Sequence, residues 1–138
     1  EPLPNIAAFA KACEIRMAHF DEDFQHVQSL ADYLHQQVAA LLPDAAFNGV
    51  GDIPHVVNLS LPGCKSEVML RVLESDEVYV SSGSACSKGK QSGVLKALGL
   101  PKVRTDSALR VSFCPSNTTE DVDAFIAAAQ KGRKMLVR

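Results

Sequence analysis

Two residues of this chain have side chains that could take part in chemistry, and the first is Cys86. It lies in the segment 81–93, SSGSACSKGKQSG, where serine and glycine fill eight of 13 positions. Such a segment has much backbone freedom and little to bury. A thiolate is a nucleophile, and Lys88 and Lys90 could lower the thiol pKa through their positive charge. The segment therefore predicts either a mobile, reactive thiol or an incidental exposed cysteine.

The second candidate is Arg110, in the segment SALRVSF at residues 107–113. Its apolar neighbours point to the opposite face of the expected strand, and an arginine in such a strand needs a carboxylate or phosphate partner. Two interpretations stay open. Arg110 binds an anionic group of a substrate, or it forms a structural ion pair, for example with Asp106 or Glu120.

Other residues near Cys86 could support a reactive thiol. Ser84 and Ser87 could donate hydrogen bonds to the thiolate, and we group Ser82 and Gly83 with them as the supporting part of the loop. The segment from Gly83 to Lys90 resembles a phosphate-binding P-loop only faintly. Five residues separate its glycines and Gln91 follows the lysine, whereas that loop needs four residues and then serine or threonine.

The four cysteines do not have the spacing of a metal site. They are Cys13, Cys64, Cys86 and Cys114, and none forms a Cys-x-x-Cys pair. We therefore expect no bound metal and four reduced thiols. Cys13 lies on an apolar stripe and is expected to be packed, and Cys114 is expected to be structural. His19, His26 and His35 fall off that stripe and are expected on the solvated surface.

Length and composition predict one globular domain over residues 1–138. Apolar residues make up 46% of the chain, which argues against disorder, and the net charge of −2 argues against a nucleic-acid binder. No apolar run approaches the length of a membrane helix, and the start lacks the pattern of a signal peptide, so we expect a cytoplasmic protein. The start also lacks an initiator methionine, so we expect a piece of a longer chain.

The elements that position the two candidates follow from hydrophobic periodicity and turn residues. One apolar stripe predicts a single long helix over residues 5–42, packed on a sheet. Thr118 is expected as the N-cap of the last helix, with Asp121 completing a capping box. Strands are predicted at 55–61, 78–80 and 107–113, and further helices at 65–77 and 93–99. The prediction is an α/β fold of the α+β type: a small, mainly antiparallel sheet of three to four strands with helices on one face.

Taken together, three phrases resemble a known family. VYVSSGSACSKGK, then VLKALGL, then SALRVSF look like the C-terminal region of cysteine desulfurases, which are pyridoxal-phosphate enzymes of the fold-type-I aminotransferase superfamily. The likeness extends over nearly the whole chain, from the helix beginning PNIAAFAKA to the last helix. It covers only the small domain of such an enzyme.

This resemblance implies roles for both candidates. Cys86 matches the nucleophile that takes sulfur from L-cysteine as a persulfide and leaves L-alanine, and Arg110 matches the arginine that holds the substrate carboxylate. It also implies pyridoxal phosphate in the intact enzyme, a homodimer, and a sulfur-acceptor or iron–sulfur scaffold protein as partner. The long serine- and glycine-rich loop resembles the branch of the family that supplies iron–sulfur cluster assembly.

The resemblance also predicts what this chain lacks. None of its eight lysines occurs in the Ser-His-Lys phrase that holds the cofactor, and Glu1 looks like the last residue of a Gly-Thr-Glu phrase. We therefore expect the fragment to bind no cofactor and to be inactive alone. Two alternatives remain. One is a free-standing sulfur carrier that uses Cys86 without a cofactor, and the other is a selenocysteine lyase or aminotransferase-like relative.

Overall fold

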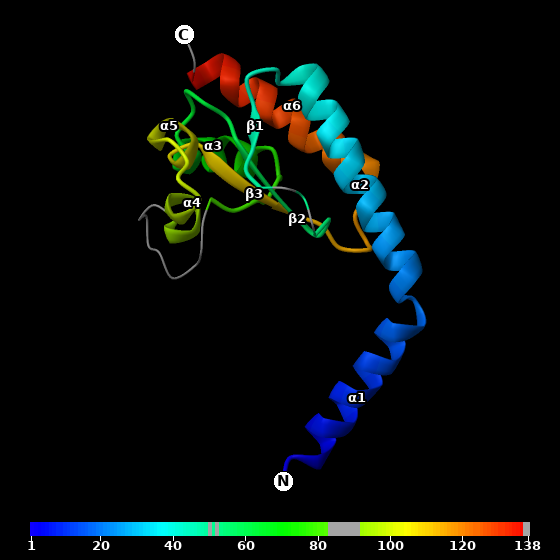
Figure 1. Cartoon of the computed structure of the whole chain (residues 1–138). Helices are drawn as coiled ribbons and strands as arrows, with labels where there is room; N and C mark the ends of the chain where they lie inside the picture. Colours follow the sequence, from blue (N-terminus) through cyan, green and yellow to red (C-terminus); the bar gives the residue numbers. More distant parts are fainter. Residues whose placement is uncertain (50, 52, 83–91, 137–138) are drawn as a thin grey trace.

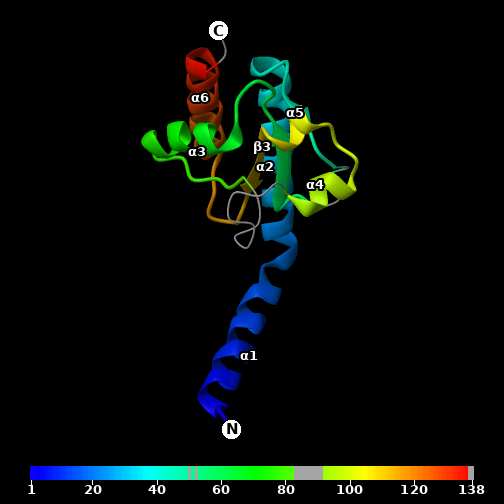
Figure 2. The ribbon, with the colours of Figure 1, turned by 90° about the vertical axis from the view of Figure 1, so that its left-hand side faces the viewer.

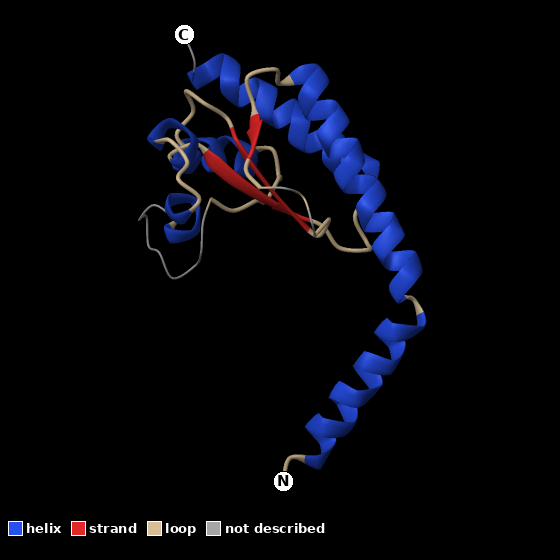
Figure 3. Ribbon diagram, viewed as in Figure 1, coloured by secondary structure: helices blue, strands red, loops and turns tan. Residues whose placement is uncertain are grey.

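The structure is a computed structural model that describes residues 1–49, 51, 53–82 and 92–136. A small sheet packs against long helices, and one helix projects away from them (Figures 1 and 3). The helices are α1 (Leu3–Ala18), α2 (Phe20–Leu41), α3 (Ser66–Ser75), α4 (Gly93–Ala97), α5 (Lys102–Thr105) and α6 (Thr119–Leu136). The strands are β1 (Ala46–Phe47), β2 (Val56–Ser60) and β3 (Ala108–Ser112). In the part of the chain described, no helix is long and apolar enough to cross a membrane.

The sheet has the order β1-β2-β3, and both strand pairs are antiparallel. The main core lies between one face of this sheet and helices α2, α3 and α6. The strands give this core alternate residues, namely Val57, Leu59, Leu109 and Val111. The predicted fold class, a small antiparallel sheet with helices packed on it, is therefore confirmed. The short helix α5 lies instead at one end of the other face, where the buried Ser60 donates a hydrogen bond to the Arg104 carbonyl.

The single helix expected over residues 5–42 is wrong, because the chain leaves helical geometry at His19 (φ −119°, ψ 11°) and α2 begins anew. Three acidic residues occupy the first turn of α2, where they suit the positive end of the helix dipole. An ion pair of 2.9 Å joins Arg16 to Asp23 across the break.

The two helices also differ in burial. Five residues of α2 are buried, but none of α1 is, and α1 points away from the sheet in both views (Figures 1 and 2). Cys13 is accordingly exposed, so the expectation of a packed thiol there is wrong. The apolar stripe of α1 has no partner among the described residues that would bury it.

The strand expected at 78–80 is not formed within the described part of the chain, where residues 78–80 belong to no strand and Ser81 forms an isolated bridge to Arg110. They follow a Schellman turn that ends α3. The amide of Val78 donates to the Leu73 carbonyl, and Glu77 occupies the left-handed position with φ 59°. The predicted start of α6 and the Asp121 half of the capping box are confirmed, since Asp121 accepts a 3.0 Å hydrogen bond from the Thr118 amide and α6 begins at the next residue.

Candidate functional site

The face of the sheet opposite the main core carries the polar side chains of β2 and β3. Residues alternate along β3, so Leu109 and Val111 are buried in the core while Arg110 and Ser112 are exposed. This alternation is the one expected from the sequence. It places Arg110 on the open face, at the centre of the strand.

Arg110 has a neighbour on each side of β3. On one side Arg110 and Ser81 exchange two backbone hydrogen bonds, of 2.6 and 3.2 Å. On the other side its register partner in β2 is Asn58. Because the backbone groups of Arg110 are used toward Ser81, Arg110 and Asn58 form a non-hydrogen-bonded pair, the closer kind, with Cα atoms about 4.5 Å apart. Residues directly opposite in an antiparallel pair share a face, so Asn58, Arg110 and Ser81 form a row across the open face.

The guanidinium of Arg110 has no structural partner in the described part of the chain. It forms no ion pair within 4.0 Å and no side-chain hydrogen bond there, so neither Asp106 nor Glu120 holds it. The Glu120 carboxylate instead accepts a 3.3 Å hydrogen bond from Thr119. Of the two interpretations left by the sequence, this geometry favours an anionic group from outside these residues.

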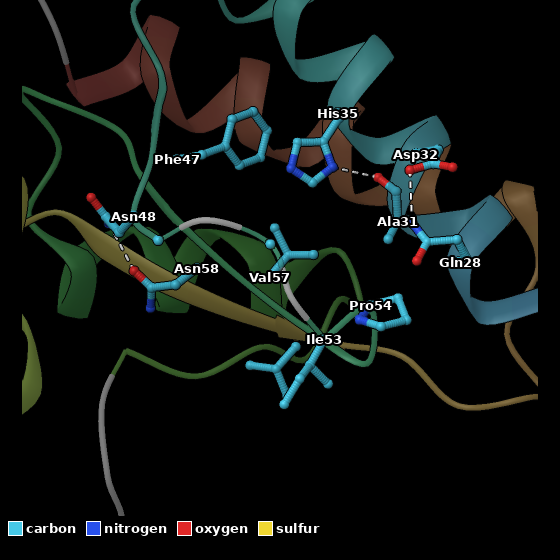
Figure 4. Close-up of a pocket in the computed structure, with 13 residues that line it drawn as sticks. Gln28, Ala31, Asp32, His35, Phe47, Asn48, Ile53, Pro54, Val57 and Asn58 are labelled. Atoms are coloured by element: carbon cyan, nitrogen blue, oxygen red, sulfur yellow. Dashed lines mark hydrogen bonds between the residues drawn. The ribbon is translucent and has the colours of Figure 1, made fainter. Parts of the chain in front are cut away.

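A polar network that the sequence analysis missed lies beside this row. Arg104 donates to the Asn48 side-chain oxygen, and Asn48 donates to Asn58 and to Ser60 at 2.7 Å each. The bond between the two asparagines is drawn in Figure 4. Sequence separations of ten to 56 residues hide such a network, because only the pairing of β1, β2 and α5 brings its members together.

The pocket shown in Figure 4 lies next to this network and has a volume of about 240 Å³. Its walls come from α2, from β1 and β2, and from the residues between these two strands. His35 stacks on Phe47 with ring centroids 4.1 Å apart, and its Nδ1 lies 2.7 Å from the Ala31 carbonyl oxygen. His35 is thus half-buried and packed, not simply solvated as expected, and the pocket does not include Arg110.

Cys86, Gly83, Ser84 and Ser87 lie outside the described residues. Of the predicted loop residues, only Ser82 is described, half-buried and directly after the Ser81 bridge. The structure therefore positions the two ends of the segment, at Ser81 and at Ser92, whose hydroxyl accepts the N-capping hydrogen bond from the Leu95 amide.

The other thiols differ in environment. Cys64 is buried, and burial raises the pKa of its thiol. Cys114 is exposed, not part of the core as a structural cysteine would be. A hydrogen bond with Ser116, at 3.1 Å, lowers the pKa of the Cys114 thiol. Cys114 is therefore a second accessible thiol close to the end of β3.

The described residues do not fit as the holder of a pyridoxal phosphate. A covalently held cofactor needs a lysine in a pocket, but every described lysine is exposed and none lines a described pocket. In the same part of the chain, no group of three histidine, cysteine or acidic side chains could hold a metal ion. The open face offers instead an unpartnered guanidinium in a row of polar side chains.

Comparisons with known families and with solved structures agree with this fold. The aminotransferase class-V family model matches residues 1–125, and the chain belongs to this family. It is 32% identical over 130 residues to a cysteine desulfurase of Nostoc sp., covering 91% of this chain and 32% of that protein. It is 31% identical over 137 residues to cysteine desulfurase IscS of Clostridium botulinum, covering 95% and 34%.

Solved structures agree with the fold. A NifS-like protein from Rickettsia africae superposes with a TM-score of 0.82 over 97% of this chain and 35% of the other, at 24% identity. A further NifS-like protein gives the same TM-score over 99% of this chain. The chain spans about a third of the length of the relatives it matches.

Proposed function

We propose that residues 1–138 are the C-terminal small domain of a cysteine desulfurase. Cys86 takes the sulfur of L-cysteine, and Arg110 binds the substrate carboxylate. The observation that carries this proposal is the exposed Arg110 guanidinium, which has no counter-ion among the described residues and lies beside Ser81, where the segment containing Cys86 begins. Relatives named cysteine desulfurases support it.

The proposed reaction moves one sulfur atom from L-cysteine to Cys86. The Cys86 sulfur bonds to the substrate sulfur, and the substrate bond between Cβ and sulfur breaks. Cβ gains a proton and becomes the methyl group of L-alanine, so one thiol and one L-cysteine give one persulfide and one L-alanine. The persulfide then passes its outer sulfur to an acceptor protein and the Cys86 thiol is restored.

The anchoring of Ser81 supports a shared site for the two residues. Cys86 is five positions after Ser81 in the sequence, and an extended chain spans at most about 3.6 Å per residue. Cys86 can therefore reach any point within about 18 Å of the Ser81 Cα atom, which includes the Arg110 head group and points beyond the domain surface. This reach suits a thiol that collects sulfur at one place and delivers it at another.

The remaining parts of the proposal lie outside this chain. Pyridoxal phosphate would be held by other residues of the full-length protein, since the described lysines are exposed and line no described pocket. This chain alone would therefore be inactive. The full-length protein would be a homodimer and would deliver sulfur to an iron–sulfur scaffold or another acceptor. A cytoplasmic location, which keeps thiols reduced, completes the proposal.

The test uses the full-length protein with Arg110→Ala and Arg110→Lys. Loss of a charge-assisted pair and of substrate orientation should lower kcat/KM for L-cysteine by at least about ten- to a hundredfold in the alanine variant. Arg110→Lys should keep only part of the wild-type kcat/KM, because a point charge cannot reproduce the two parallel hydrogen bonds of a guanidinium.

Thermal melts of the same variants provide the control for folding. An unchanged kcat/KM in Arg110→Ala would remove this residue from the substrate site and with it the proposal. A Cys86→Ser variant that still releases sulfur at the normal rate would exclude the persulfide step while leaving the role of Arg110 to be judged by its own kinetics.

A further inference from the structure

We propose that Asn58 donates a second hydrogen bond to the anionic group that Arg110 binds, and that Arg104 and Asn48 fix the orientation of its amide. Asn58 would be a specificity-determining residue, and Arg104 and Asn48 would be positioning residues. This inference rests on the proposed function, because it takes the substrate carboxylate as the ligand of Arg110.

The orientation of Asn48 follows from donor and acceptor chemistry. The guanidinium of Arg104 can only donate hydrogen bonds, so the Asn48 atom at 3.0 Å from its Nε must be the amide oxygen. The Arg104 Nη2 group donates to the same oxygen and to the Phe47 carbonyl. The Asn48 nitrogen therefore faces the other way, toward Asn58 and Ser60.

Ser60 keeps this arrangement from reversing. Its hydroxyl hydrogen is donated to the Arg104 carbonyl at 2.8 Å, so its oxygen accepts from the Asn48 nitrogen at 2.7 Å. Ser60 is fully buried, and a rotated Asn48 amide would leave its hydroxyl facing a second acceptor. Arg104, Asn48 and Ser60 thus form a closed ring of hydrogen bonds with one possible orientation.

The orientation of the Asn58 amide is fixed by its hydrogen bond with Asn48, a member of this ring. Because the Asn48 nitrogen donates to it at 2.7 Å, the Asn58 atom on that side is the amide oxygen, as drawn in Figure 4. Asn48 follows β1, on one side of β2, whereas Arg110 lies in β3 on the other side. The amide nitrogen of Asn58 is left for the β3 side, and its two hydrogens have no acceptor among the described residues.

Two groups of donors consequently lie side by side on the open face. Asn58 and Arg110 are a non-hydrogen-bonded pair, whose side chains are the closest across an antiparallel ladder. The positive end of an amide dipole next to a guanidinium is unfavourable unless an anion accepts from both. A carboxylate has two oxygens and acceptor positions enough for both partners.

The experiment uses the full-length, cofactor-loaded protein with Asn58→Ala, Asn58→Asp and Asn48→Asp. The two readouts are KM and kcat for L-cysteine, and the calorimetric Kd for the product L-alanine, which keeps the carboxylate. We expect Asn58→Ala to raise KM and Kd about tenfold with little change in kcat. Asn58→Asp should weaken binding further, because its carboxylate pairs with Arg110 and repels the substrate.

Asn48→Asp tests whether Asn48 orients the Asn58 amide, at a residue that does not itself contact the ligand. Its carboxylate still accepts from Arg104 but cannot donate to Asn58, so the Asn58 amide turns and offers Arg110 its oxygen. We expect KM and Kd to rise roughly three- to tenfold. Gln25→Glu, the same amide-to-acid change on the exposed side of α2, is the matched control and should leave both unchanged.

Each outcome decides a different statement. Weak L-alanine binding in Arg110→Ala together with normal binding in both Asn58 variants would overturn this inference and leave the proposed function standing. Normal binding in Arg110→Ala would overturn the proposed function itself. Melts that show the Asn58 and Asn48 variants folded, with KM and Kd unchanged, would reduce the network to a structural one.

Discussion

The two faces of the β2–β3 pair are built from neighbouring residues with opposite environments. Leu59 and Leu109 face each other on the core side and are fully buried, while Asn58 and Arg110 face each other on the open side. On the core side, Leu59 and Leu109 belong to one cluster of buried apolar residues. On the open side Arg110 has no partner among the described residues, although the polar network is satisfied up to the Asn58 oxygen.

This difference distinguishes the core face, which stabilises the sheet, from the open face, which offers groups for binding. Apolar burial stabilises a fold with any side chains of about the right size and shape. An unpartnered guanidinium adds little to folding, so its presence at the centre of β3 needs a ligand to explain it. Stability and substrate binding should therefore respond to substitutions on different faces, although the residues are adjacent in the chain.

The largest effect should come from Leu109→Ala compared with Arg110→Ala in chemical unfolding. Removal of the Leu109 side chain leaves a cavity among Leu59 and its neighbours and should lower the free energy of unfolding by about 2–5 kcal/mol. Arg110→Ala removes an exposed side chain and should change it by less than about 0.5 kcal/mol. Denaturant titrations followed by circular dichroism measure both.

If Leu109→Ala and Arg110→Ala lowered the free energy of unfolding equally, the two faces would not differ in their contribution to stability. It would mean that Arg110 is held by a structural contact, and its role would be stability and not binding. A small effect of Leu109→Ala would instead show that the core face is less important for folding than its complete burial indicates.

A smaller effect on the core side is expected at Gly132, where α6 approaches α3. A Cβ atom at this position would lie 2.5 Å from the Met69 sulfur and 3.3 Å from Val72. Met69 is fully buried and cannot move into solvent, so Gly132→Ala should lower the free energy of unfolding by about 1–3 kcal/mol. This cost exceeds the gain of up to about 1 kcal/mol that alanine brings to a helix.

Gly93→Ala is the matched control, since its Cβ would meet no atom of the described residues within 4 Å. That variant should be neutral or slightly more stable in the same denaturant titration. If Gly132→Ala were equally harmless, α3 and α6 would not be as close as the packing requires. A Met69→Leu substitution should restore part of the lost stability by shortening the opposing side chain.

The smallest expected effect concerns the turn that leads from α3 toward Ser81 and the open face. Glu77 has the left-handed φ of 59°, which costs a residue with a Cβ about 1–2 kcal/mol and costs glycine nothing. Glu77→Gly should raise the free energy of unfolding by about 1 kcal/mol at most, since glycine also gains entropy when unfolded.

Glu74→Gly makes the same chemical change inside α3 and should lower stability by about 1 kcal/mol. Opposite signs for the two variants in thermal melts are the expected result. The same sign for both would mean that the Schellman turn is not formed as described, and that the path of the chain into Ser81 differs.

The sequence allowed the prediction of features that depend on local patterns. Alternation in SALRVSF predicted which side of β3 Arg110 occupies, and Thr118 with Asp121 predicted the start of α6. The break at His19 was missed because the apolar stripe of α1 continues in phase with that of α2, and periodicity does not say which part of a stripe finds a partner in the same chain.

The polar network could not be predicted, since its members come from three segments and their side chains meet only after β1, β2 and α5 pack. The exposure of Cys114 was missed for a similar reason, because its environment depends on Ser116 and on how the chain leaves β3. Family resemblance, and not spacing, assigned Cys86, and this assignment remains a prediction.

The central claim is that Cys86, and not another thiol, accepts the sulfur. Cys114 is the strongest alternative acceptor, because its thiol is exposed and has a lowered pKa. The direct measurement treats the full-length, cofactor-loaded protein with L-cysteine, blocks thiols by alkylation, and determines which peptide has gained one sulfur atom. We predict the gain on the peptide that contains Cys86, and none on that peptide in Cys86→Ser. A sulfur atom found instead on the peptide of Cys114 or Cys13 would contradict the account.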